Sequence, residues 1–334
     1  MPTRTLPGAT PAAETAQIGF LWLEITGRCQ LNCARCYASS GPAGTHGTMT
    51  SAHWQAVIDD AARLGATMVQ FIGGEPTLHP ALPSLAEHAL GAGIEVEIYT
   101  NLVHVTPALW DLFRLPGVRL ATSWYSELPA EHEQITRRPT HERTLANIRR
   151  AAEFGIPLRA GVVGVLDQQR TAGGITVLER AGVADIGYDD LRQVGRGVRN
   201  TGPGVAQLCG RCGDRKAAIS PTGQVWPYVF ARWMPAGSVL EASLAEIVTG
   251  AAFRDVVGGL REAFGRSGKR CEPDRCAPEQ CNPKCGPSCS PACAPQNNCR
   301  PTSTCSPAYG SCNPDKRLCN PDRDCQPNKC RPTS

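Results

Sequence analysis

Three cysteines near the start of the chain have a spacing suited to an iron–sulfur cluster. They lie directly after the apolar segment 20–26, in Gly27-Arg-Cys29-Gln-Leu-Asn-Cys33-Ala-Arg-Cys36-Tyr37. Three thiolates on one tight loop can bind three irons of a cubane, which leaves the fourth iron open for an exchangeable ligand. The alternative for the triplet alone is a zinc site completed by His46 or His53. The position of the loop after a strand favours the cluster.

A short glycine motif follows the second predicted strand. Gly73-Gly74-Glu75-Pro76 comes directly after the apolar run 69–72. Glycine lets the backbone approach a ligand closely. Carbonyls at this edge of a sheet, and the Glu75 carboxylate, can accept hydrogen bonds from an ammonium group. Taken alone, the motif fits an ordinary β–α turn equally well; together with the cysteine triplet, it favours a ligand site.

Both motifs need a scaffold, and the pattern of residues 18–204 predicts one. Short apolar runs alternate with segments of helical spacing. We predict strands at 20–26, 67–72, 94–99, 118–124, 158–166 and 186–191, and helices at 51–64 (with Ser51 as N-cap), 80–90, 107–113, 141–154 and 175–181. This alternation predicts an α/β fold with a parallel sheet, and six units suit a partial, open (β/α)6 barrel. Beyond it we predict a strand at 225–229 and helices at 240–247 and 252–260.

The triplet, the aromatic residue that follows it and the glycine motif together resemble the radical S-adenosylmethionine (SAM) superfamily. The resemblance covers about residues 18–200. It implies a radical SAM barrel whose [4Fe–4S] cluster is bound by Cys29, Cys33 and Cys36, with SAM chelating the open iron. It also implies SAM contacts from Tyr37, Gly73, Gly74, Glu75 and Pro76, the last four holding the methionyl amine.

Further SAM contacts in this family come from later strands. The resemblance places Thr100, Asn101 and Ser123 where polar groups face the SAM ribose or carboxylate. Arg159 could pair with the carboxylate, since a guanidinium fork suits that geometry. Val163 lies on the strand that would pack against adenine. Ordinary barrel packing explains each of these residues equally well.

A second cysteine pair, Cys209 and Cys212, lies beyond the barrel. The stretch is similar to the auxiliary-cluster regions called SPASM or twitch, whose pattern continues with a glycine, four residues and a cysteine. Here Gly223 is followed by Tyr228 at the cysteine position. We expect an auxiliary [4Fe–4S] cluster on Cys209 and Cys212. A zinc knuckle or a metal-free redox dithiol are the alternatives.

The C-terminal tail repeats one short unit. Each of its twelve cysteines is followed two residues later by proline, and the tail has too few large apolar residues for a core. We expect it to bind further clusters, through Cys271, Cys276, Cys281, Cys285, Cys289 and Cys293. A zinc-binding wrap and a partly disordered extension are alternatives. The predicted division is a flexible arm (1–17), the barrel (18–204), a small Cys-rich auxiliary region (205–264) and the tail (265–334).

Composition excludes several classes of protein. The 334 residues carry a net charge of +4, from 34 basic and 30 acidic residues, which does not favour nucleic-acid or membrane binding. No apolar run reaches the ~18 residues of a membrane span. The N-terminus lacks the pattern of a signal peptide. Seventeen cysteines in clusters, with none between Cys36 and Cys209, favour metal binding in the cytoplasm over disulfides.

The resemblance also implies an activity. Reductive cleavage of SAM gives a 5′-deoxyadenosyl radical, which abstracts hydrogen from a substrate. The barrel plus auxiliary region favours an oxidoreductase or maturase acting on a ribosomally made peptide, by cross-linking, epimerisation or oxidation. We expect flavodoxin or ferredoxin as electron donor and, because only residues 1–17 precede the first strand, a separate leader-binding protein or the barrel itself for recognition.

Two other functions compete with this one. They are a radical SAM dehydrogenase or epimerase of a small molecule, and a non-catalytic metal-binding or cluster-carrier protein. A carrier has no use for a glycine motif at a barrel edge. Candidate proton or hydrogen donors are Cys212, Tyr125, Tyr228, His132 and Asp189, with His132 expected in a polar loop.

Overall fold

The computed structural model describes residues 18–199, 202–208, 212–266, 305–306 and 311–312. Several predictions lie outside these residues and stay predictions: those for the N-terminal arm, Cys209, Cys271, Cys276, Cys281, Cys285, Cys289 and Cys293. Of the tail, the structure describes the backbone of two short paired strands, β9 (Cys305–Ser306) and β10 (Ser311–Cys312).

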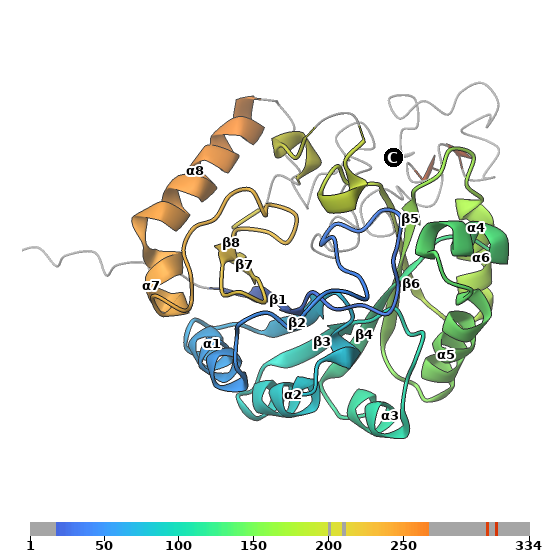
Figure 1. Ribbon diagram of the computed structural model, residues 1–334, viewed down its shortest axis with the longest axis horizontal. Helices are drawn as coiled ribbons and strands as arrows, with labels where there is room; N and C mark the ends of the chain where they lie inside the picture. Colours follow the sequence, from blue (N-terminus) through green and yellow to red (C-terminus); the bar gives the residue numbers. More distant parts are fainter. Residues whose placement is uncertain (1–17, 200–201, 209–211, 267–304, 307–310, 313–334) are drawn as a thin grey trace, which may run out of the picture.

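One curved sheet organises residues 18–266 (Figure 1). Its strand order is β6-β5-β4-β3-β2-β1-β7-β8. The strands are β1 (Phe20–Thr26), β2 (Met68–Gly73), β3 (Glu95–Tyr99), β4 (Val118–Trp124), β5 (Leu158–Gly164), β6 (Asp185–Asp190), β7 (Lys216–Ile219) and β8 (Val225–Trp226). All neighbouring strands pair in parallel except β7 and β8, which are antiparallel. The predicted α/β architecture with six β–α units is therefore confirmed.

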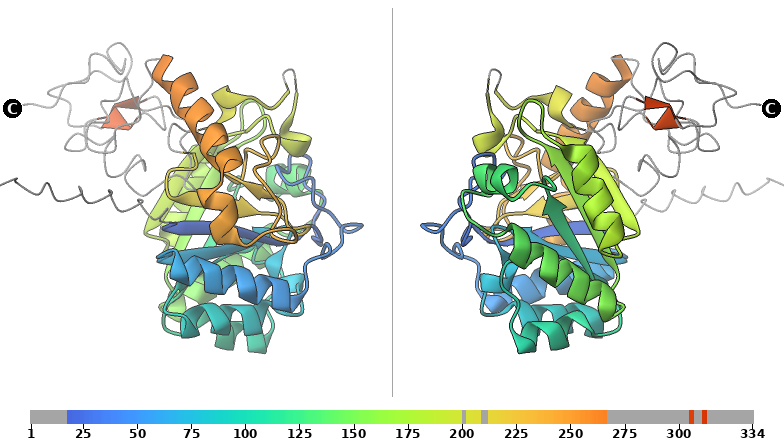
Figure 2. Two further views of the ribbon diagram at one scale, coloured as in Figure 1. Left: turned by 90° about the vertical axis from the view of Figure 1, so that its left-hand side faces the viewer. Right: turned by 90° about the vertical axis from the view of Figure 1, so that its right-hand side faces the viewer.

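Helices follow the strands, and α1, α2, α3, α5 and α6 cover the outer side of the sheet (Figures 1 and 2). The α-helices are α1 (Ser51–Arg63), α2 (Leu82–Gly91), α3 (Pro107–Phe113), α4 (Pro129–Thr136), α5 (His141–Glu153), α6 (Thr171–Arg180), α7 (Leu244–Thr249) and α8 (Ala251–Arg266). Short 3₁₀ turns are η1 (Pro76–Leu78), η2 (Gly195–Gly197) and η3 (Val205–Gln207). No helix in the described ranges is long and apolar enough to cross a membrane.

Two boundaries differ from the predicted ones because of side-chain capping. Thr50, not Ser51, is the N-cap of α1: its hydroxyl accepts from the backbone N–H of His53, whose ring accepts in return from the Thr50 N–H. Helix α7 begins at Leu244 rather than at 240, because Ser243 and Glu246 form the equivalent capping box. Capping decides helix ends more locally than apolar spacing does.

The region after the barrel is part of the same sheet. Strand β7, which the sequence analysis did not predict, pairs in parallel with β1 over four residues. It extends the sheet beyond the six barrel strands, and Trp22 of β1 belongs to one buried cluster with Leu208, Cys212 and apolar residues of 218–231. The described part of the region 205–264 is thereby fixed against the start of the barrel.

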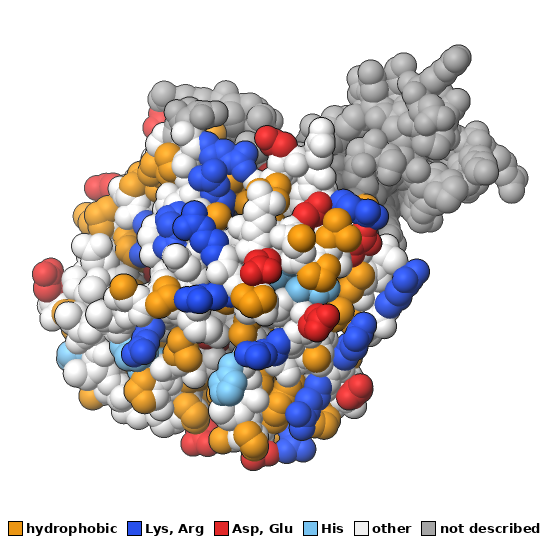
Figure 3. Space-filling model, turned by 45° about the vertical axis from the view of Figure 1, so that its right-hand side comes forward, with side chains coloured by type: hydrophobic (Ala, Val, Ile, Leu, Met, Phe, Trp, Pro, Cys, Tyr) orange, Lys and Arg blue, Asp and Glu red, His pale blue; other side chains and the backbone are white. Residues whose placement is uncertain are grey.

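Charged side chains are distributed over the surface. On the face shown in Figure 3, Lys and Arg side chains lie among apolar and acidic ones. This distribution agrees with the near balance of basic and acidic residues in the sequence.

Candidate functional site

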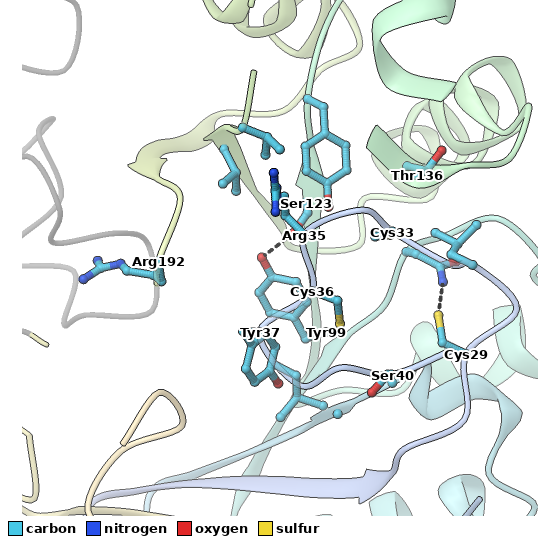
Figure 4. A pocket seen from close by; sticks show the side chains of 18 of the residues that line it. Cys29, Cys33, Arg35, Cys36, Tyr37, Ser40, Tyr99, Ser123, Thr136 and Arg192 are labelled. Carbon is cyan, nitrogen blue, oxygen red and sulfur yellow. Dashed lines mark hydrogen bonds between the residues drawn. The ribbon is translucent and has the colours of Figure 1, made fainter. Parts of the chain in front are cut away.

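The three N-terminal cysteines lie on the long loop between β1 and α1 (Figure 4). Neighbouring backbone fixes this loop: the Cys29 N–H donates to the carbonyl of Gly41 at 3.0 Å, and the Ala34 N–H donates to the carbonyl of Ile135 at 2.8 Å. The second of these bonds ties the loop to the end of α4. Cys29 is buried and the other two thiols are partly buried, and all three are free thiols.

All three thiols line one cavity of about 210 Å³. A single buried water needs about 10–15 Å³ on this measure, so the cavity is large enough for a ligand. Seven further predicted site residues line it: Tyr37, Gly73, Gly74, Thr100, Asn101, Ser123 and Val163. Segments far apart in the sequence thus meet at the carboxyl ends of the strands, where ligands bind in open α/β sheets.

Glycine is required at the end of β2, because other backbone passes very close. A Cβ on Gly73 would lie 2.4 Å from the carbonyl oxygen of Thr26, and one on Gly74 would lie 2.2 Å from that of Arg28. Gly73 also has φ = +123°, which favours glycine. The two glycines therefore let β2 press against the start of the cysteine loop, while their own backbone faces the cavity.

Glu75 does not line the cavity, and its contact with the SAM amine stays a prediction. It is 1% exposed and accepts four hydrogen bonds from the protein. Two come from Thr77, one from the hydroxyl of Thr100 at 2.7 Å and one from the N–H of Asn101 at 2.8 Å. Three of these bonds reach Oε1 and one reaches Oε2, so most of the acceptor capacity of this carboxylate is used within the protein. Glu75, followed by the buried Pro76, therefore connects the ends of β2 and β3.

Asn101 continues this connection to the cysteine loop. Its amide exchanges hydrogen bonds with the side chain of Gln30 at 3.1 and 3.2 Å, and its Nδ2 lies 3.7 Å from the Sγ of Cys29. A donor near this sulfur stabilises a thiolate and orients it.

Arg159 does not line the cavity either. Its guanidinium forms a two-pronged ion pair with Glu97 on β3, with both N–O distances 2.7 Å. Both side chains are largely buried, and Glu97 also accepts from Gln70. Arg159 is therefore engaged inside the barrel, and we no longer assign it to the SAM carboxylate.

The environment of the thiols favours a bound cation. Burial raises the pKa of both Cys29 and Cys33 to about 12, and the Glu75 carboxylate adds to the effect at Cys29. Thiolates in such surroundings need compensating positive charge, which iron ions supply. The donor set and the cavity beside it therefore fit a [4Fe–4S] cluster bound by Cys29, Cys33 and Cys36.

The zinc alternative fits less well. His46 bonds to the hydroxyl of Thr26 at 2.9 Å and packs edge-to-face on His79, while His53 belongs to the cap of α1. Within the described residues, no three His, Cys, Asp or Glu side chains are grouped to hold one metal ion. A zinc ion requires such convergence, whereas cluster thiolates each bind a different iron.

Tyr37, which lines the cavity, and Tyr228, which does not, belong to an apolar cluster that includes Ala218 of β7. Tyr37 lies edge-to-face on Phe230, which in turn contacts Tyr228. Tyr228 is 1% exposed and belongs to the same cluster of buried side chains as Cys212. The position at which the auxiliary pattern expects a cysteine is thus filled by a packed aromatic ring.

Two contributors to the site were missed or misplaced by sequence reasoning. His132 lies on α4 rather than in a polar loop; it is 2% exposed, lines the cavity, and burial lowers its pKa to about 4. Arg196 in η2 donates to the carbonyls of Cys33 at 2.9 Å and Ser40 at 2.6 Å, and its N–H donates to that of Cys36 at 2.9 Å. No sequence pattern reveals Arg196, because its partners are backbone atoms of a distant loop.

Comparison with protein families decides the assignment. Residues 23–170 match the model of the radical SAM superfamily. The chain contains a radical SAM domain. This family implies a [4Fe–4S] cluster and SAM as cofactors, which agrees with the thiols and the glycine motif around the cavity.

Curated relatives of this chain include enzymes with different names. It is 32% identical to AdoMet-dependent heme synthase of Methanosarcina barkeri, over 42% of this chain and 41% of the relative. It is 29% identical to PqqA peptide cyclase of Streptomyces rochei, over 56% and 52% of the two chains, and 27% identical to that of Xanthomonas campestris pv. campestris, over 76% and 77%. The chain thus spans about half the length of the first two relatives.

The fold has solved counterparts. Streptococcus suis SuiB, in a crystal structure with precursor peptide SuiA, matches with a TM-score of 0.62 at 13% identity, over 74% of this chain and 67% of SuiB. A second structure of SuiB holds S-adenosylmethionine and matches with a TM-score of 0.61. At this identity the likeness concerns the fold alone.

Proposed function

We propose that this protein is a radical SAM enzyme that cleaves SAM reductively and abstracts hydrogen from a peptide substrate. The observation that carries the proposal is the meeting of three free thiols and the Gly73–Gly74 backbone around one ligand-sized cavity. A [4Fe–4S] cluster held by Cys29, Cys33 and Cys36 would supply one electron for cleavage of the carbon–sulfur bond of SAM, which would give methionine and the 5′-deoxyadenosyl radical.

The residues around the cavity have separate proposed roles. Cys29, Cys33 and Cys36 hold the cluster, and the backbone of Gly73 and Gly74 receives the methionyl amine. Thr100, Asn101 and Ser123 offer polar groups along the ends of β3 and β4, although the hydroxyl of Thr100 already donates to Glu75 and that of Ser123 bonds to Tyr99 at 3.0 Å. Val163 and Tyr37 supply apolar walls that exclude water.

A peptide substrate is supported by the names of relatives. The PqqA peptide cyclase of Xanthomonas campestris pv. campestris is similar to this chain over 76% of its residues. The SuiB structure that shares this fold contains a precursor peptide. The reaction on the peptide, whether cross-linking, epimerisation or oxidation, is a matter for product analysis. We also propose an auxiliary cluster that uses Cys212, Cys209 and tail cysteines, and flavodoxin or ferredoxin as electron donor.

Anaerobic reconstitution with iron and sulfide tests the first part. The reduced chain should convert SAM to 5′-deoxyadenosine, and replacement of Cys29, Cys33 and Cys36 by Ala should abolish this conversion. Cys212→Ala is the matched control: it should retain deoxyadenosine formation yet bind less iron. Deoxyadenosine formation by the triple variant would show that the active cluster lies elsewhere. If the wild-type chain binds no more iron than one [4Fe–4S] cluster contains, the proposed auxiliary cluster is rejected.

Mass spectrometry tests the second part. A short precursor peptide, incubated with reduced enzyme and SAM, should either lose two hydrogens or keep its mass in H2O and take up deuterium when the reaction is run in D2O. An unmodified peptide, with modification of a sugar, nucleoside or amino acid instead, would favour the small-molecule function.

A further inference from the structure

A groove on the outer surface lies between α3 and the C-terminal half of α5 (Figure 1). Its volume is about 230 Å³, which is similar to that of the cavity around the thiols, and the two share no lining residue. Its walls include two arginines, Arg114 and Arg150, and two aromatic residues, Trp110 and Phe154. This α3–α5 groove is therefore separate from the proposed SAM site.

Arg150 is held in the groove by aromatic rings. Its guanidinium carbon lies 5.2 Å from the ring centroid of Trp110 and 5.2 Å from that of Phe154, and the two rings meet edge-to-face at 5.4 Å. With the residues that the structure describes, this guanidinium forms neither a hydrogen bond nor an ion pair. Contacts with ring faces orient a guanidinium without using its five N–H donors. Arg150 therefore presents a positioned fork that can bind an anion.

Arg114 differs from Arg150 because its charge is already compensated. Its guanidinium lies over Phe154 at 5.3 Å, pairs with Asp111, and donates from Nε to the carbonyl of Trp110 at 3.2 Å. Asp111 also lines the groove, so it cancels one of the two positive charges in the walls. One positive charge remains, and a carboxylate suits it because both carboxylate oxygens can accept from one guanidinium fork.

Phe154 adds an apolar requirement to the same site. Its side chain is 40% exposed, whereas that of Trp110 beside it is 3% exposed. An exposed ring next to an unpaired cation is matched by a carboxylate that has an apolar neighbour. A peptide segment with acidic and apolar side chains meets both requirements, and arginines are a recurrent means of binding acidic peptide motifs.

Helix α5 connects the groove to the cavity around the thiols. Thr144, near the start of this helix, lines the cavity, and its hydroxyl donates to the carbonyl of Asn101 at 3.2 Å. Arg150 lies six residues further along the helix, a rise of about 9 Å. An extended peptide covers this length with about three residues, and further residues would pass over the rim of the barrel. A peptide with its reactive residue in the cavity can thus reach the groove with a flanking segment.

We propose that the α3–α5 groove binds an acidic segment of the peptide substrate, outside the residue that is modified. A carboxylate of this segment pairs with Arg150, and an apolar side chain packs on Phe154. The inference rests on the proposed function, because it assigns a second contact to the same peptide. Such a contact selects the substrate by a segment that takes no part in the chemistry.

Three peptides with a rhodamine label test the groove. They are the amides of Gly-Glu-Phe-Glu-Gly, Gly-Gln-Phe-Gln-Gly and Gly-Glu-Ala-Glu-Gly. Fluorescence anisotropy measures their binding to the anaerobically reconstituted full chain with SAM. The first peptide should bind about fivefold more tightly than either of the others. Its advantage over the Gln peptide should disappear in about 1 M salt, where the Debye length is about 3 Å.

Substitutions in the groove should remove each preference separately. Arg150→Gln should abolish the preference for Glu over Gln, and Phe154→Ala should abolish that for Phe over Ala. Arg149→Gln is the matched control: Arg149 is the neighbouring exposed cation on α5 and does not line the groove, so its loss should leave both preferences intact.

Two results would overturn the proposal: equal binding of the three peptides by the wild type, or an equal loss of preference in Arg150→Gln and Arg149→Gln. If Arg150→Gln does not fold, Arg150→Lys decides, because lysine keeps the charge but not the fork. A preference unchanged from wild type in that variant rejects the two-pronged contact.

An electron-donor protein is the other candidate partner for a basic groove. If Arg150→Gln slowed reduction of the cluster by flavodoxin and left peptide binding unchanged, the groove would belong to the donor and the proposal would fail.

The proposed function fails separately from this inference. Deoxyadenosine formation by the dithionite-reduced wild type without peptide depends on the cluster and on SAM, not on the groove. A chain that cleaves SAM but binds the three peptides equally would lose only the groove assignment. A chain that shows the peptide preference but does not cleave SAM would lose the proposed function.

Discussion

Successive side chains of β1 face two different environments. Leu21, Leu23 and Ile25 are fully buried in the core between the sheet and its helices. Trp22 and Glu24 point the opposite way, toward the barrel interior, where Glu24 pairs with Arg232 at 2.7 Å. The two faces are equally buried, yet the outer one is filled by apolar side chains alone and the inner one combines aromatic packing with paired polar groups.

The polar interior continues across neighbouring strands. Gln70 on β2 donates to Glu97 on β3, which pairs with Arg159 on β5. The Arg159 guanidinium also lies 5.6 Å from the ring centre of Tyr99, whose hydroxyl bonds to Ser123. Apolar packing tolerates exchanges of similar volume, whereas such a network depends on each partner. The outer face therefore specifies the fold, and the inner face specifies the position of the site.

The largest loss of stability is expected for Glu97→Ala. This change leaves the Arg159 charge buried without its partner, which costs about 3–5 kcal/mol. Urea unfolding measures the change. The double variant Glu97→Met with Arg159→Met should recover most of the loss, since an apolar pair needs no counter-charge. A single variant that loses less than about 1 kcal/mol would contradict the importance of the pair.

Leu23→Ala probes the outer face. Removing a fully buried leucine should cost about 2–4 kcal/mol in unfolding free energy, through lost burial and a residual cavity. Because the change lies on the helix side, SAM affinity should stay within about twofold of wild type. Leu128→Ala is the control: that side chain is 37% exposed, and its loss should cost about 0.5 kcal/mol or less. A large drop in the SAM affinity of Leu23→Ala would show that the outer face of β1 also determines the position of the site.

Lowering the pH is expected to have a smaller effect on the free energy of unfolding. Burial lowers the pKa of His132 from about 6.5 to about 4, so between these values the unfolded chain binds a proton that the folded chain does not. Stability is therefore complete above pH 6.5 and is lost as the pH falls toward 4, by about 2 kcal/mol at pH 5 from this residue. His132→Gln should lose less stability between pH 7 and pH 5 than wild type does. An equal loss in both proteins would assign the acid sensitivity to other groups, such as His79, whose pKa is also lowered to about 4.

The smallest change in stability, about 1 kcal/mol, is expected for Arg196→Ala. The variant loses the two side-chain hydrogen bonds to the carbonyls of Cys33 and Ser40, both on the cysteine loop. Its reconstituted cluster should therefore lose iron faster in air than that of wild type. Arg137→Ala removes a cation near the same thiol and should not change this rate. Equal rates for Arg196→Ala and wild type would show that the loop holds its position without the arginine.

The parts of the molecule that depend on local pattern are predictable from the sequence. Strands β1 and β4 have the predicted bounds, and the thiols and Gly73–Gly74 line one cavity as expected. Contacts between distant partners are not predictable in this way: the pairing of Arg159 with Glu97 joins two strands, and Arg196 binds a loop more than 150 residues earlier. Strand β7 was not predicted either, because a four-residue strand buried by its neighbours has no distinct periodicity. Local sequence pattern predicts helices and strands, whereas the tertiary fold decides which polar side chains become hydrogen-bond partners.

The sheet remains open in the part of the chain that the structure describes. Its edges are β6 and β8, which do not pair with each other. Leu191 and Arg192 after β6, and Val229 and Phe230 after β8, line the same cavity, so the segments that follow the two edge strands complete its wall where the strands leave it open.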